Sequence, residues 1–163
     1  MANTQSMCTS FLGELMLGQH QFGTSTIVSR TSLTSPTTDT VKAALYLASA
    51  TMNASTTVYT VTGEVSGTGY TAGGVTATNA TAPTSTNSSA TAGVGYWTPS
   101  ASIVYTTVTL TTAFDTVLIY NSTQSNKAIS VHTFGSQTVT AGTFTLTMPS
   151  NTTAAALIRL STT

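Results

Sequence analysis

Strict alternation of apolar residues with threonine is the feature that most constrains how this chain can fold. In the segment GTFTLTM, Gly142–Met148, the apolar residues Phe144, Leu146 and Met148 are separated by single threonines. Successive side chains of a strand point to opposite faces, so this segment would have one buried and one solvated face. Threonine, valine, isoleucine and tyrosine also dominate the other periodic segments, and these residue types favour strands over helices. The pattern predicts a protein built mainly of strands.

Strand-like composition recurs in short segments separated by turn-forming sequence. The predicted strands are 42–47, 57–62, 101–110, 116–121, 127–134, 142–148 and 154–160, with turns at NSTQSN and GSQTVTA. In the third of these, Ile103 and Tyr105 share one face of the strand. Val108 and Leu110 have the opposite parity, which predicts a bulge or bend near Thr106–Thr107. We therefore predict an all-β fold, an antiparallel β-sandwich of jelly-roll type.

An N-terminal extension, residues 1–40, is predicted to precede the β-sandwich domain of residues 41–163. In the extension, the segment SFLGELMLGQHQF has apolar residues near helical spacing, although glycines interrupt it. Phe11, Leu15 and Phe22 are interface candidates, because exposed apolar side chains need a partner. That partner is either the body of the same domain or another subunit.

A low-complexity stretch, residues 76–95, interrupts the domain. It is rich in threonine, serine and asparagine and poor in large apolar side chains. Such a segment buries too little surface to offset its ordering entropy, so a long surface loop or projecting arm is predicted. Trp97 follows it and is expected to anchor the returning chain to the core, with stacking on a sugar or a partner as the alternative.

Charge is almost absent from the chain. Only 5% of the residues are charged, four basic and four acidic, against about 25% in an ordinary protein. A neutral protein associates more easily with other copies and lacks the basic surface that nucleic-acid binding needs. No apolar run approaches the ~18 residues of a membrane span, and we expect no secretory signal, because no basic region precedes Glu14. The single cysteine, Cys8, indicates a reducing compartment.

The glycine-rich segment GEVSGTGYTAGG, Gly63–Gly74, is the most distinctive stretch. Its GTGYTA portion matches the letters of a dinucleotide-binding fingerprint, but the sequence after it is not helical, and no lysine completes a phosphate-binding loop. We therefore predict no cofactor. The glycines are expected to supply positive φ angles or close backbone approach; they are Gly63, Gly67, Gly69, Gly73 and Gly74.

Glu64 and Tyr70 are the distinctive side chains of the same segment. A structural role is expected for Glu64, which would accept N–H bonds in its own turn or pair with Lys42 or Arg159, within or between subunits. A catalytic carboxylate is the alternative, and it would need a second titratable group nearby.

Catalytic and metal sites have no local signature in this chain. His20 and His132 are too few and too far apart in sequence to predict a metal site. A hydrolase acting on a cell-wall polymer would need Glu64, Asp115 and His132 to meet in the fold. We predict that the protein is not an enzyme.

Several motifs together resemble a family of small virion proteins of tailed bacteriophages. They are GQHQF, DTVKAALY, TGEVSGTGYTAGG, FDTVLIYN, NKAISVHTFG, AGTFTLTMP and ALIRL, in this order. The resemblance extends from Gly18 to Leu160, apart from the low-complexity stretch, and its most specific part is Gly63–Gly74.

The resemblance implies a capsid decoration or cement protein, a β-sandwich that sits on the shell as a dimer or trimer. Its partners would be the major capsid protein and further copies of itself, and it would be found in virions assembled in the host cytoplasm. Residues 1–22 or the glycine-rich segment would clamp adjacent capsomers. The alternative is a tail, neck or head-fibre component, with a receptor-binding role for Trp97 and the loop.

Overall fold

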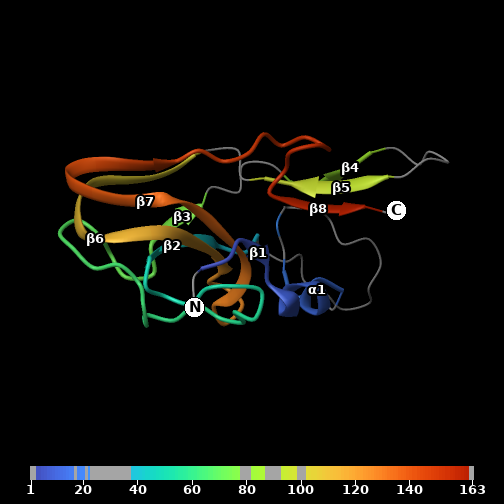
Figure 1. Cartoon of the computed structure of the whole chain (residues 1–163). Helices are drawn as coiled ribbons and strands as arrows, with labels where there is room; N and C mark the ends of the chain where they lie inside the picture. Colours follow the sequence, from blue (N-terminus) through green and yellow to red (C-terminus); the bar gives the residue numbers. More distant parts are fainter. Residues whose placement is uncertain are drawn as a thin grey trace.

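Two antiparallel sheets and one short helix make up the described part of the protein (Figure 1). The computed structural model describes residues 3–16, 18–20, 22, 38–77, 82–86, 93–98 and 102–161. The larger sheet has the order β1–β7–β6–β2–β3, with strands Ser6–Met7, Lys127–Leu146, Ile103–Asn121, Val41–Leu47 and Val75–Ala77. The smaller sheet has the order β4–β5–β8, with strands Thr84–Ser85, Val94–Trp97 and Ile158–Ser161; helix α1 is Thr9–Met16. The predicted all-β, antiparallel class is confirmed.

The hairpin of β6 and β7 dominates the larger sheet, because its strands have 19 and 20 residues. The turn predicted at NSTQSN joins them, but the turn predicted at GSQTVTA is wrong, since those residues continue β7. Register shifts place extra residues of β7 between Thr133 and Gln137 and near Ala141. The glycine and serine of this run therefore form bulges, which bend a strand without ending it. The bulge predicted near Thr106–Thr107 is confirmed by the shift there and by Thr107, with φ 53°.

The hairpin folds back on itself at these bulges, as its aromatic contacts show. Phe144 pairs with Tyr105 in the register, so in a straight hairpin Phe144 would lie about 30 Å from Phe114 at roughly 3.3 Å per residue. The two rings are instead 5.1 Å apart, and Phe144 lies 5.3 Å from Phe134 of its own strand. The two halves of the hairpin therefore enclose an aromatic core.

Two other strand predictions need correction. The segment Thr57–Thr62 is not a strand. It meets the sheet through an isolated bridge between Val58 and Lys127, and through the hydroxyl of Tyr46, which donates to the carbonyl of Thr60 at 2.6 Å. Its valines face solvent, with Val58 46% and Val61 66% exposed, so its apolar alternation has no buried face. The last strand begins at Ile158, because the alanines before it lie in a turn. Strand β2 agrees with the predicted segment 42–47.

The low-complexity stretch is only partly a loop. Residues 76–77 belong to β3, Thr84–Ser85 form β4, and β5 begins at Val94. Outside these strands, residues 82–83, 86 and 93 have no regular structure, while residues 78–81 and 87–92 lie outside the described part of the chain.

The N-terminal segment packs on the body of its own chain. Strand β1 pairs with β7 through Ser6 and Met7, and Cys8 and Phe11 are completely buried. Burial, together with the nearby charge of Glu14, raises the pKa of the Cys8 thiol to about 12, so this thiol is unreactive at neutral pH. Helix α1 agrees with the helical spacing of this segment.

No helix in the described ranges is long and apolar enough to cross a membrane.

Candidate functional site

The glycine-rich segment, Gly63–Gly74, lies along the edge of β2 that β3 leaves uncovered. The N–H of Leu47 donates to the carbonyl of Gly63 at 2.9 Å, and the N–H of Val65 donates to Leu45 at 3.0 Å. Along β2, between the contact with Gly63 and the residues that pair with β3, the hydroxyl of Tyr70 accepts the backbone N–H of Leu45 at 3.0 Å. A side chain thus takes the place of a neighbouring strand at this position.

The same segment also reaches the far half of β6. The N–H of Thr109 donates to the carbonyl of Thr68 at 2.9 Å, and the two residues form an isolated bridge. Tyr105 of β6 donates its hydroxyl proton to the carbonyl of Ala43 in β2 at 2.8 Å. The segment therefore joins the two halves of the folded hairpin, and we call it the glycine-rich clasp.

The predicted backbone role of the five glycines is confirmed. Positive φ angles occur at Gly63, Gly69, Gly73 and Gly74. A Cβ atom on Gly74 would lie 1.7 Å from the carbonyl oxygen of Ala43, and one on Gly67 would lie 2.0 Å from that of Thr109. The clasp can approach β2 and β6 this closely only because these positions carry no side chain.

Glu64 is the central acceptor of the clasp and is 9% exposed. Its Oε1 accepts the hydroxyl of Tyr70 at 2.7 Å and the N–H of Gly73 at 2.8 Å. Its Oε2 accepts the hydroxyl of Tyr59 at 2.6 Å. The predicted N–H bond within the segment is confirmed. Within the chain, the alternative ion pairs are not formed: Lys42 makes none with Glu64, and Arg159 lies in the other sheet.

Tyrosines surround this carboxylate and act as neutral donors. Tyr120 donates to the carbonyl of Gly73 at 2.8 Å, and its ring stacks on that of Tyr59 with centroids 4.8 Å apart. Burial, reinforced by the charge of Glu64, raises the pKa of Tyr120 to about 12. Burial and the hydrogen bond to Glu64 raise the pKa of Tyr70 well above its ordinary value. These hydroxyls keep their protons at neutral pH, which suits a structural cluster.

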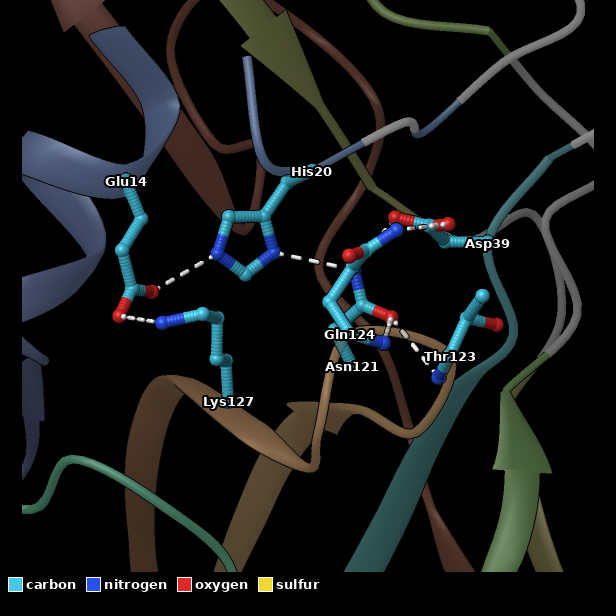
Figure 2. A network of polar contacts seen from close by, with 7 residues as sticks. All are labelled: Glu14, His20, Asp39, Asn121, Thr123, Gln124 and Lys127. Atoms are coloured by element: carbon cyan, nitrogen blue, oxygen red, sulfur yellow. Dashed lines mark hydrogen bonds and ion pairs between the residues drawn. The ribbon is translucent and has the colours of Figure 1, made fainter. Parts of the chain in front are cut away.

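A second polar network ties the N-terminal segment to the hairpin (Figure 2). His20 contacts Oε2 of Glu14 through Nε2 at 2.9 Å and the side-chain amide of Asn121 through Nδ1 at 3.1 Å. The same amide donates to Asp39 at 2.6 Å. Lys127 completes the network with an ion pair to Oε1 of Glu14 at 2.8 Å. Burial opposes ionisation of Glu14, but the hydrogen bonds and charges of Lys127 and His20 outweigh it and lower its pKa.

The orientation of Asn121 determines the tautomer of His20. The Oδ1 atom of Asn121 accepts the N–H groups of Thr123 and Gln124, at 3.1 and 3.2 Å. Its amide nitrogen must therefore face His20. Nδ1 of the ring accepts this hydrogen bond, so Nε2 carries the ring proton and donates a hydrogen bond to Glu14. Both ring nitrogens are satisfied within the protein.

A cavity of about 390 Å³ is lined by this N-terminal segment on one side and by the smaller sheet on the other. Leu15 and Phe22 line it, together with His20, Trp97 and residues of β4, β5 and β8. The rings of Phe22 and Trp97 stack with centroids 4.6 Å apart, and Trp97 is 2% exposed. The anchoring role predicted for Trp97 is consistent with this burial. Of the predicted interface residues, Phe11 is completely buried and Phe22 nearly so.

The residues of the hydrolase alternative have separate partners. Asp115 accepts hydrogen bonds from Asn3 at 2.8 Å and from the hydroxyl of Thr116 at 2.7 Å. His132 contacts the hydroxyl of Ser130 at 2.9 Å, and Glu64 belongs to the clasp. Within the described ranges, no group of three or more His, Cys, Asp or Glu side chains could hold a metal ion.

Replacing His132 with glutamine is expected to reduce the acid sensitivity of folding. Burial lowers the pKa of His132 from 6.5 to about 4, so the unfolded chain binds this proton more tightly than the folded protein. The wild type therefore loses stability as the pH falls from 6.5 to about 4, by about 1–3 kcal/mol because the side chain keeps some solvent contact. Urea unfolding of both proteins at about pH 7 and about pH 4.5 measures the difference. Equal losses in the two proteins would show that His132 is not the group responsible.

Several residues of these networks were not predicted, namely Asp39, Tyr59, Tyr120 and Asn121. One signal could have indicated a pair of them. Asp39 precedes β2 and Asn121 ends β6, and the antiparallel register pairs Val41 with Asn121. A carboxylate before one strand and an amide at the end of its neighbour are therefore adjacent, but only once this pairing is known.

Comparisons of the chain with protein-family models, with curated proteins and with solved structures gave no match.

Proposed function

We propose that this protein is a structural component of a tailed-phage virion, a capsid decoration protein that binds across neighbouring capsomers and stabilises the shell. One observation carries the structural part: all four acidic residues are used to join segments of the chain. Glu64 joins the two ends of the clasp by accepting the N–H of Gly73. Glu14 joins the N-terminal segment to the hairpin through Lys127, and Asp39 joins the start of β2 to it through Asn121. Asp115 accepts a hydrogen bond from Asn3. The virion assignment rests on the sequence resemblance.

The geometry favours the smaller sheet, with the cavity beside it, as the surface that contacts the shell. Phe11 and Phe22 already have partners in their own chain, so they are poor candidates for clamping a neighbour. Leu160, by contrast, is 44% exposed at the rim of the cavity. The major capsid protein is the proposed partner, and a homodimer or homotrimer would repeat the contact over the lattice, so that weak contacts sum to a firm attachment.

The fold proposed for this role is a jelly-roll-type sandwich. A two-layer fold is supported by the hairpin, whose two halves pack face to face over the aromatic core. The clasp contacts both halves at one edge. The virion is the proposed location, after assembly in the host cytoplasm.

Shell stabilisation is the expected effect of adding this protein. A protein that binds assembled shells but not loose capsid subunits raises the stability of the shell by mass action. Purified protein titrated into shells of its own phage that lack it should raise their melting temperature until the sites are saturated. Leu160→Asp should weaken this effect, and Val104→Asp, at a similarly exposed position, provides the matched control. No rise at saturating protein would contradict the decoration role.

A further inference from the structure

The cavity beside the smaller sheet has a buried floor and an exposed rim. Trp97, Phe22 and Ile158 form the floor and are 2%, 6% and 6% exposed. Leu160 and Thr84 lie at the rim. The volume of about 390 Å³ falls within the range of roughly 300–1,000 Å³ that is usual for small-molecule sites. A molecule in the cavity would rest on these buried side chains and stay open to solvent at the rim.

The lining is uncharged and mainly apolar. None of the described residues that line the cavity is Asp, Glu, Lys or Arg. His20 offers only its ring carbons, because Glu14 and Asn121 occupy both of its nitrogens. Side-chain hydroxyls at the exposed edge come from Thr84 and Ser85 of β4. A charged ligand would lose its hydration here without gaining a counter-charge.

We propose that this cavity binds a neutral, mainly apolar small molecule of about two to three aromatic rings in size, with any polar end at Thr84 and Ser85. The apolar floor supplies the binding free energy through burial of the ligand, and the hydroxyls orient it. This binding role does not depend on the virion assignment.

Trp97 gives a direct measurement, because it is the single tryptophan of the chain and lies at the floor of the cavity. The probe is N-phenyl-1-naphthylamine, a neutral aromatic molecule that accepts excitation energy from tryptophan. Titration of the protein should quench the emission of Trp97 and raise that of the probe, with saturation at one site. Energy transfer that rises linearly, without saturation, would overturn the proposal.

Gly95 allows the cavity to be filled without a clash. Residues 95 and 97 share a face of β5, and a Cβ on Gly95 would meet only the carbonyl oxygen of Leu160, at 3.9 Å. Gly95→Leu should therefore place its side chain beside Trp97 and lower the affinity for the probe at least about tenfold. Gly135→Leu is the matched control, because a Cβ there has no neighbour within 4 Å and the site lies outside the cavity lining. Unchanged affinity in a folded Gly95→Leu protein would contradict the proposed site.

Leu160→Asp tests the site without altering its floor. This rim position is 44% exposed, so the fold should tolerate the change, while a carboxylate at the mouth should weaken binding of an apolar probe. Val104→Asp, at a 40% exposed position outside the cavity lining, should leave binding unchanged. If Gly95→Leu fails to fold, equal affinities of the Leu160→Asp and Val104→Asp proteins would by themselves overturn the proposal.

Discussion

Replacing Gly74 with alanine is expected to lower the free energy of unfolding by more than about 3 kcal/mol. The residue has φ +67°, and its new Cβ would lie 1.7 Å from the carbonyl oxygen of Ala43 and 2.8 Å from the Cα of Ala44. Both neighbours are backbone atoms of β2, so relief of the clash requires the clasp or β3 to leave that strand. Urea unfolding at neutral pH, followed by circular dichroism, measures the loss.

Gly135→Ala is the control for this experiment. It also adds a methyl group to a glycine, but at a strand position where a Cβ meets no atom within 4 Å. Its stability should stay level or rise by roughly 0.5–1 kcal/mol, because glycine is costly within a strand. A Gly74→Ala protein as stable as the wild type would show that the clasp does not hold β2 in the way described.

Replacing Glu64 with alanine is expected to lower the free energy of unfolding by about 3–5 kcal/mol. The change leaves the hydroxyls of Tyr59 and Tyr70 and the N–H of Gly73 without their acceptor. It also opens a void among tyrosine rings, which adds to the loss. Urea unfolding again gives the difference between variant and wild type.

Two variants separate the charge and the single hydrogen bonds of Glu64 from its bulk. Glu64→Gln keeps the size and one oxygen, so it should cost less than Glu64→Ala. Tyr59→Phe removes one bond to the carboxylate and should cost about 1.5–3 kcal/mol at most. If Glu64→Ala lost no more than Tyr59→Phe, the carboxylate would not be the common acceptor that joins the clasp.

The sequence predicts best those features that are local. The alternation of Phe144, Leu146 and Met148 is confirmed, since these residues are partly buried and the threonines between them are exposed. The parity change around Thr107 also predicts a bulge that the structure contains, because the change depends only on residues that are neighbours in the sequence. Turn-forming residues at GSQTVTA mislead because glycine and serine suit a bulge as well as a turn.

The partners of the predicted site residues could not be predicted from local pattern. The glycines and the N–H bond to Glu64 lie within one short segment, so its backbone role could be inferred. Tyr120 reaches the same site only because β6 pairs with β2, beside the clasp. Tyr59 is five residues from Glu64 in sequence, but its place depends on the bridge of its neighbour Val58 to Lys127. The cavity likewise depends on the pairing of β5 with β8, across more than sixty residues of sequence, as Gly95 with Leu160 shows. Such contacts are fixed by the whole fold.

Cryo-electron microscopy of the phage particle that carries this protein tests the central claim most directly. The account predicts density that matches the folded hairpin and the smaller sheet, repeated over the junctions between capsomers, with the smaller sheet toward the shell. Density confined to the tail, neck or a head fibre would contradict the decoration role, and a particle without this density would contradict the virion assignment itself.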